Sequence, residues 1–127
     1  MTFPFYCVAA AFLLNYLSKV PLAHAMNQES SYDNRHPRDQ QARLTGWGRR
    51  ALAAHLNSFE ITPIFAVSVI VAHLFQADPS SMNTWAAVFV GSRIVYHILY
   101  MANIHVARTS IWGVGALAVA ANFYLAA

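Results

Sequence analysis

Charged and strongly polar side chains interrupt two otherwise apolar stretches of this sequence, and their spacing indicates a shared chemistry. In the first stretch, Arg50, Asn57 and Glu60 follow one another at intervals of seven and three residues. At about 100° per residue in an α-helix, these intervals place the three side chains on one broad stripe. Guanidinium groups bind carboxylates in bidentate fashion, and a carboxylate binds an ammonium group. The stripe therefore predicts a pocket for an anionic or zwitterionic ligand, and His55 lies within the same stretch.

A second polar stripe is predicted in the next long apolar stretch. Its members are spaced three, four and three residues apart: Arg93, Tyr96, Tyr100 and Asn103. His97 lies on the flank of this stripe. A charged side chain inside a membrane helix is costly when it faces lipid. We therefore expect the two stripes to face each other or a neighbouring subunit.

Two other interpretations of these residues stay open at this point. The stripes could form an interhelical network that only holds the helices together, with Glu60 paired to Arg93. His55 and His97 could bracket a b-type haem across two helices. No pair of histidines shows the spacing of a metal motif, so we expect no metal site.

The composition requires a bilayer or a comparable apolar environment. Hydrophobic residues make up 57% of the 127 residues and charged residues only 10%, against about 25% in typical soluble domains. Four apolar segments are each close to the roughly 20 residues that an α-helix needs to cross a membrane. Their approximate bounds are residues 3–25, 43–76, 83–104 and 109–127. We therefore predict an all-α integral membrane protein, a four-helix bundle that forms one domain over residues 1–127.

The basic residues predict how this bundle lies in the membrane. Five of the eight lysines and arginines fall between Arg35 and Arg50, and Arg108 lies in the connection between the third and fourth segments. The positive-inside rule then places the first and third connections in the cytoplasm and both termini outside. Residues 1–25 are expected to stay in the protein as a helix. A leader peptide has basic residues before its apolar run, and this segment has none there. Nucleic acid is not an expected partner, since the basic patch is flanked by apolar segments.

Several motifs in the chain resemble one known family. The run Ala54–Phe65 (AHLNSFEITPIF) is similar to the second-helix motif of the membrane-associated proteins in eicosanoid and glutathione metabolism, the MAPEG family. The run Arg93–Tyr100 (RIVYHILY) is similar to the third-helix signature of that family. The pair Arg108 and Ser110 resembles the arginine and serine that open its fourth helix, and residues 32–38 resemble a loop of bacterial members.

The resemblance implies a fold, a co-substrate and site residues. Members of the family are four-helix subunits that assemble as homotrimers and bind glutathione between adjacent subunits. The residues at matching or nearby positions that are expected to bind glutathione are Arg50, His55, Asn57, Glu60, Arg93, Tyr96 and Tyr100. Arg108, with Ser110, is expected to lie near the sulfur as the catalytic pair. A free thiol has a pKa of about 8.5, so a nearby cation helps to populate the nucleophilic thiolate.

The leading hypothesis is a glutathione-dependent transferase or peroxidase that acts on lipophilic electrophiles or lipid hydroperoxides from the bilayer. The sequence departs from the family at Ala53 and Leu56, where some members carry arginines, and Arg49 or Arg50 one turn earlier is the candidate to replace them. A second hypothesis is therefore a non-catalytic accessory or lipid-binding subunit of a larger membrane complex. A third is an enzyme of the same fold that uses another anionic thiol or lipid. A bacterial inner membrane is the expected location.

Overall fold

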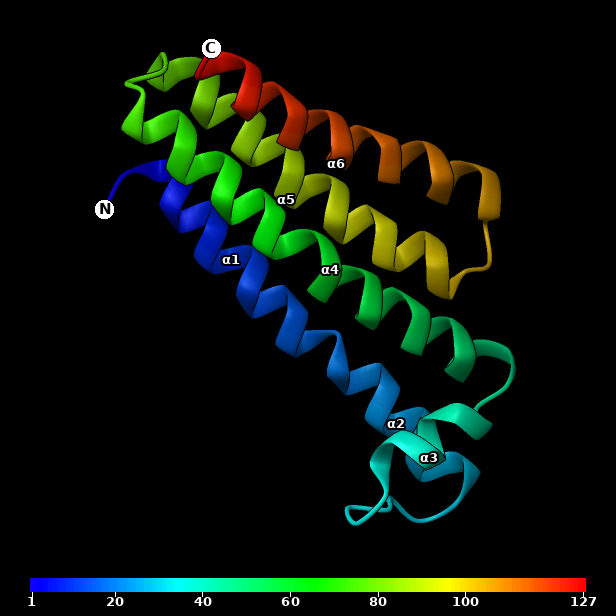
Figure 1. The fold of residues 1–127 in the computed structure, drawn as a ribbon. Coiled ribbons are helices and arrows are strands. Elements are labelled where there is room, and N and C mark those ends of the chain that lie inside the picture. The colour runs from blue at the N-terminus through cyan, green and yellow to red at the C-terminus, as the bar shows by residue number, and fades with distance from the viewer.

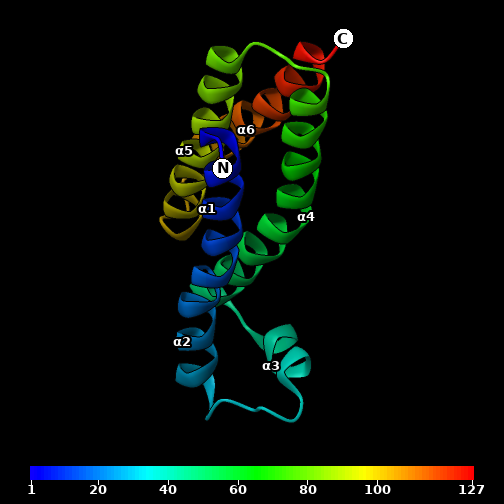
Figure 2. The ribbon, with the colours of Figure 1, turned by 90° about the vertical axis from the view of Figure 1, so that its left-hand side faces the viewer.

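The computed structural model describes all of residues 1–127 and contains helices but no strands (Figure 1). The helices are α1 (Phe3–Leu17), α2 (Lys19–Glu29), α3 (Pro37–Arg43), α4 (Gly46–Leu74), α5 (Pro79–Met101) and α6 (His105–Leu125). The all-α prediction is therefore confirmed. Figures 1 and 2 show α1 and α2 following each other along one line, while α4, α5 and α6 run beside α1. The N-terminus, the α4–α5 connection and the C-terminus lie at one end of the molecule.

The observed helix bounds differ most from the predicted ones in the first segment and in the first connection, and α5 and α6 each begin four residues earlier than predicted. The first segment breaks at Ser18 and then continues as α2 to Glu29. Pro21 lacks the amide hydrogen that would bond to the carbonyl of Leu17, which weakens the helix at this point. The connection that was expected to run from residue 26 to residue 42 also contains α3, whose first residue is Pro37. Proline is well tolerated there, because the first amide of a helix has no partner inside it.

The ends of α4 and α5 follow from local backbone chemistry. Asp78 precedes Pro79, and its carboxylate accepts a hydrogen bond of 2.8 Å from the amide of Ser81, which fixes the start of α5. Gln76 and Asn103 adopt positive φ angles of 57° and 61° directly after α4 and α5. Such left-handed residues let the next amides bond back to the last carbonyls of the helix. Asn103 therefore ends α5. It does not extend the polar stripe of that helix, although its spacing predicted that it would.

Small residues bring α5 and α6 close together. A Cβ atom added to Gly115 of α6 would lie 2.8 Å from Oγ of Ser92 in α5. Close approach at glycine is a common means of packing membrane helices. On the other side of α5, the ring of Phe89 stacks on Phe65 of α4 with 3.8 Å between centroids. These contacts fix how α4, α5 and α6 are rotated against one another, and thereby where their polar residues meet.

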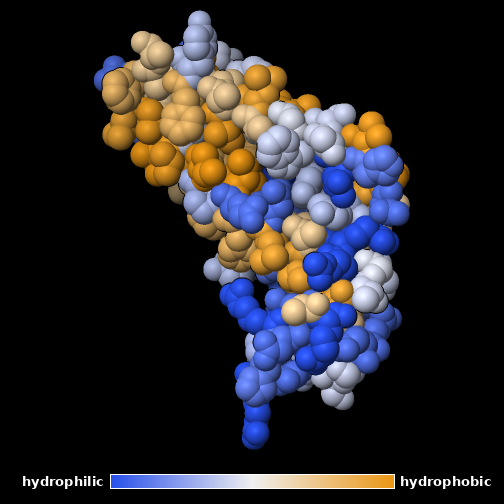
Figure 3. All heavy atoms as spheres, turned by 45° about the vertical axis from the view of Figure 1, so that its right-hand side comes forward, coloured by the Kyte–Doolittle hydropathy of each residue, from blue (hydrophilic) through white to orange (hydrophobic).

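Much of the apolar surface remains exposed. Only 30 of the 127 residues are buried, so most of the large hydrophobic side chains cannot belong to a core. Figure 3 shows apolar side chains gathered toward the end with the chain termini and polar side chains around α2 and α3. Two helical stretches, Phe3–Glu29 and Gly46–Leu74, are long and apolar enough to cross a membrane. The prediction of four spans stays a prediction for α5 and α6, which are not among these two stretches.

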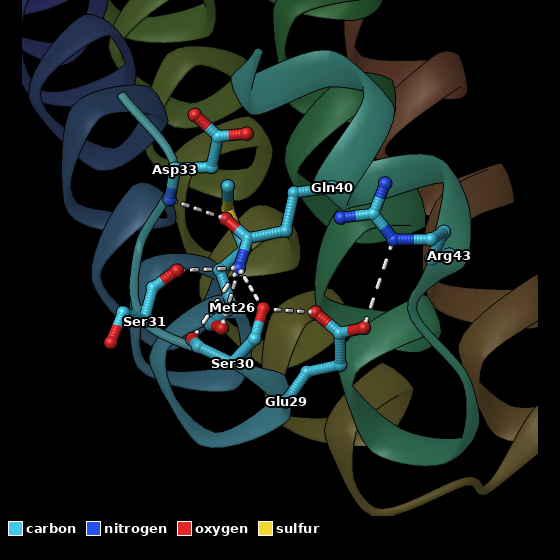
Figure 4. Close-up of polar contacts among 7 residues, drawn as sticks. All are labelled: Met26, Glu29, Ser30, Ser31, Asp33, Gln40 and Arg43. Atoms are coloured by element: carbon cyan, nitrogen blue, oxygen red, sulfur yellow. Dashed lines mark hydrogen bonds and ion pairs between the residues drawn. The ribbon is translucent and has the colours of Figure 1, made fainter. Parts of the chain in front are cut away.

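One buried glutamine organises the connection between α2 and α3 (Figure 4). Gln40 is fully buried, and its amide nitrogen donates to the carbonyl oxygen of Met26 at 2.9 Å and to Oγ of Ser30 at 3.0 Å. Its amide oxygen accepts from the backbone nitrogen of Asp33 at 2.9 Å. The amide hydrogens of His36 and Arg35 in turn hold the pKa of the Asp33 carboxyl below its usual value. The nearby ion pair of Arg43 and Glu29 is exposed, and such pairs contribute little.

Replacing Gln40 by glutamate is expected to open this connection. The substitution puts an acceptor where the amide nitrogen now donates to several oxygens, so buried acceptors face each other and the local structure loses at least about 2 kcal/mol. Hydrogen exchange at the Asp33 amide and proteolysis within residues 30–36 should both accelerate. The matched control is Gln41→Glu, because Gln41 is only partly buried and reaches just the sulfur of Met26, at 3.8 Å. Equal protection in the two variants would contradict the proposed role of Gln40.

Candidate functional site

Arg93 lies at the centre of the polar residues that α4 and α5 bring together. Its side chain is 2% exposed, and Nη2 donates a hydrogen bond of 2.8 Å to Oδ1 of Asn57. The guanidinium carbon lies 4.0 Å from the centroid of the Tyr96 ring, which is a cation–π geometry. Nε of Arg93 is buried and has no partner within the chain. A buried donor without a partner is costly, so this site lacks one acceptor.

The aromatic residues of α5 extend this cluster to α6. The rings of Tyr96 and Tyr100 meet edge to face with 5.4 Å between centroids. The guanidinium carbon of Arg108 lies 4.3 Å from the centroid of Tyr100. Tyr96, Tyr100 and Arg108, with Thr109 and Trp112, line a cavity of about 160 Å³. A continuous row of contacts thus runs from the interior of the chain to its surface, and we call it the tyrosine ladder. Its members are Arg93, Tyr96, Tyr100 and Arg108.

Glu60 reaches the cluster only through Asn57. Nδ2 of Asn57 donates to Oε2 of Glu60 at 3.4 Å, while Oδ1 of the same side chain accepts from Arg93. No ion pair joins Glu60 to Arg93. The one ion pair within the chain joins Arg43 and Glu29. The direct pairing of Glu60 with Arg93, which the sequence left open as an alternative, is therefore not formed within the chain. Glu60 is exposed, so its carboxylate remains free to bind a cationic group.

Three of the predicted site residues lie apart from the Arg93 cluster. Arg50 donates to the carbonyl oxygen of Met101 at 3.4 Å, at the far end of α5. His55 contacts Ser18 of the α1–α2 junction. Ser110 is exposed, and its hydroxyl donates back to the carbonyl oxygen of Val106 at 3.2 Å. The structure therefore joins Asn57, Glu60, Arg93, Tyr96, Tyr100 and Arg108, and leaves Arg50, His55 and Ser110 outside.

His55 lies at the wall of a second polar pocket. The hydroxyl of Ser18 donates to the carbonyl oxygen of Asn15 at 2.6 Å, so it accepts the 2.7 Å hydrogen bond from Nδ1 of His55. Nε2 of the neutral ring is then an acceptor. The pocket has a volume of about 650 Å³ and is lined in part by Lys19, Tyr32, Arg38, His55 and Glu60. It combines two cations with one carboxylate.

Lys19, Tyr32 and Arg38 are functional candidates that the sequence interpretation did not single out. Tyr32 and Arg38 lie in the stretch 32–38 that resembles a loop of bacterial members, and Lys19 lies in the first apolar segment. The sequence pattern closest to these residues is the group of basic residues in the first connection. That pattern does not indicate which other residues the connection contacts. Only the fold shows that the connection closes over α4 next to Glu60.

A comparison with known protein families identifies the family of the chain. A sequence model of the MAPEG family matches residues 3–127, which is essentially the whole chain. The chain belongs to the MAPEG family. The resemblance seen in the motifs of α4 and α5 is thereby confirmed. No curated protein and no solved structure matches the chain in the corresponding searches.

Membership of the MAPEG family gives the chain a membrane role related to glutathione or eicosanoid metabolism at the level of the family. It also agrees with the two apolar helices that are long enough to cross a bilayer. Within this MAPEG chain, the Arg93 cluster and the pocket with Lys19 and Arg38 both lie beside Glu60.

Proposed function

We propose that this MAPEG protein is a glutathione-dependent transferase or peroxidase that acts on lipophilic electrophiles or lipid hydroperoxides. The observation that carries the proposal is the hydrogen-bonded chain from Arg93 through Asn57 to Glu60, with the guanidinium of Arg108 at the other end of the tyrosine ladder. Glutathione carries two carboxylates, one ammonium group and one thiol. The cluster offers cations for a carboxylate, a carboxylate for the ammonium group and a cation for the thiolate.

The reaction follows from the charge of Arg108. A guanidinium near the sulfur favours the thiolate over the thiol, because it stabilises the negative charge. In a transferase reaction the sulfur lone pair forms a carbon–sulfur bond, and the leaving group departs with its electron pair. In a peroxidase reaction two glutathione molecules are oxidised to the disulfide, while the hydroperoxide is reduced to an alcohol and water. Positioning and charge stabilisation are the contributions of the protein in either case.

We further propose that the active form is a homotrimer of four-helix subunits in a bacterial inner membrane, with the first and third connections in the cytoplasm. Within one chain the binding site at the Arg93 cluster is incomplete, since Nε of Arg93 has no hydrogen-bond acceptor and Glu60 is exposed. The exposed apolar side chains around it favour burial against lipid or another copy. The arginines of the first connection favour the cytoplasmic side.

Calorimetric titration of glutathione into the detergent-purified protein tests this proposal. Wild-type protein should bind, and Glu60→Ala and Arg93→Ala should each weaken binding at least about tenfold, as expected for one charge-assisted contact. Glu60 is exposed, so its replacement leaves the helix packing intact. The control is Arg49→Ala, which removes an exposed cation of α4 that has no side-chain partner.

Equal weakening by Arg49→Ala would show that overall positive charge, and not the cluster, attracts glutathione. An absence of binding at millimolar glutathione would contradict the proposal. The chain would then be an accessory or lipid-binding subunit, and its polar stripes would serve only to hold the helices together.

A further inference from the structure

The pocket that contains Lys19 and Arg38 is largely unused by the proposed reaction. Its volume of about 650 Å³ falls within the roughly 300–1,000 Å³ of small-molecule sites. Its walls come from the α1–α2 junction, the first connection with α3, and one face of α4. Of its lining residues, the proposed reaction uses only Glu60. Lys19 and Arg38 therefore have no role in that reaction.

Lys19 and Arg38 are two cations of this pocket without an anionic partner. The one ion pair within the chain lies elsewhere. The ammonium group of the partly buried Lys19 lies 5.8 Å from the centroid of the Tyr32 ring, which holds it at the pocket wall. Arg38 reaches the same pocket from the first turn of α3. Two cations against the carboxylate of Glu60 give the pocket a net positive charge, which attracts an anionic group.

The pocket lies where the apolar part of the first helical line ends. Residues Phe3–Leu17 of α1 contain no charged side chain, and Lys19 is the first charged side chain of the sequence. At about 1.5 Å per residue, Lys19 lies about 24 Å along the line from Phe3, against about 30 Å for the hydrocarbon core of a bilayer. Figure 3 shows the polar side chains around α2 and α3 beyond this level. A span by α1 therefore brings Lys19 to the boundary between acyl chains and lipid headgroups.

The wall of the pocket beside Lys19 is aromatic and exposed. The rings of Tyr16 in α1 and Phe59 in α4 meet edge to face with 6.1 Å between centroids, and both line the pocket. They are 68% and 42% exposed. Aromatic side chains are enriched where a membrane protein crosses from hydrocarbon to headgroups. The pocket thus has a cationic side and an apolar side that continues onto the surface of α1 and α4.

We propose that this pocket binds the phosphodiester headgroup of a membrane glycerophospholipid, with its acyl chains against Tyr16 and Phe59. The guanidinium of Arg38 presents paired donors that match two phosphate oxygens, and the ammonium of Lys19 supplies a second positive charge. Basic residues close to the membrane surface each gain about 1 kcal/mol from anionic lipid. A bound headgroup joins α3, which carries Arg38, to the α1–α2 junction, which carries Lys19.

The first test is native mass spectrometry of the full-length protein in detergent, titrated with phosphatidylglycerol. Wild-type protein should bind the lipid, and the double variant Lys19→Gln, Arg38→Gln should bind at least about tenfold more weakly, as expected for lost charge-assisted contacts. Lys19→Arg should retain most of the affinity, because it keeps the cation. The matched control is Arg35→Gln, since Arg35 is an exposed cation of the same connection and does not line the pocket.

The second test separates the headgroup from the acyl chains and from free phosphate. Diacylglycerol with the same acyl chains has no phosphate, so wild-type protein and the double variant should bind it equally weakly. Inorganic phosphate at millimolar concentration should leave phosphatidylglycerol bound, because it has no apolar part. Displacement by phosphate would assign the pocket to a soluble anion and overturn the proposal. Equal weakening by Arg35→Gln would also overturn it, since net charge would then explain binding. Neither test involves glutathione, so their outcome is independent of the proposed reaction.

Discussion

Replacing Arg108 by alanine is expected to lower the rate of glutathione conjugation by about a hundredfold, with little change in glutathione affinity. Removal of one preorganised group that stabilises negative charge on the reacting atoms lowers kcat by a factor of about 10²–10³. Arg108 is the cation of the ladder closest to the chain surface, where it stacks on Tyr100 at 4.3 Å. The measurement is kcat and the glutathione dissociation constant, together with the ultraviolet absorbance of bound thiolate.

Two variants define the role of Arg108 more closely. Arg108→Lys keeps the charge but loses the planar contact with Tyr100, so it should retain more thiolate than Arg108→Ala. Ser110→Ala should change the rate much less, because the hydroxyl of Ser110 is already engaged with the carbonyl oxygen of Val106. A rate that falls equally in Ser110→Ala and Arg108→Ala would assign the chemistry to the helix start and not to the cation.

Replacing Gly115 by leucine is expected to have the largest effect on stability, with a loss of about 3 kcal/mol in the free energy of unfolding. Overpacking a close helix contact forces side chains off their rotamers or separates the helices. A Cβ at Gly115 already meets Oγ of Ser92 at 2.8 Å, and a longer side chain has no free space between α5 and α6. Thermal unfolding in detergent measures the loss.

A rescue experiment checks the cause of this effect. Gly115→Ala should destabilise more mildly, because only the hydroxyl of Ser92 is close, while its Cβ lies 3.9 Å away. Adding Ser92→Ala removes that hydroxyl and should restore most of the stability. The matched control is Gly113→Ala, since a Cβ at Gly113 meets nothing within 4 Å. If the two glycine variants lost equal stability, the α5–α6 contact at Gly115 would not be the cause, because replacing glycine by alanine raises helix propensity at both positions.

The class of the protein could be predicted from the sequence. A chain with 57% hydrophobic and 10% charged residues cannot cover a water-exposed surface with polar groups, and its long apolar segments favour helices in a membrane. The start of α5 at Pro79 lies four residues before the predicted start at residue 83, although Asp78-Pro79 is a local signal that needs no tertiary contact. The motif around Asn57 and Glu60 also identified the family, since its spacing within one helix is a property of the sequence alone.

What the polar residues contact was decided only by the tertiary structure. Spacing placed Glu60 and Arg93 on stripes, but the rotation of α4 against α5 gives Arg93 the amide of Asn57 as its partner. That rotation depends on contacts such as Phe65 with Phe89, which lie far apart in the sequence. Within helices, spacing therefore predicts which residues share a face. The partner of each face depends on packing between helices, and no local pattern in the sequence encodes it.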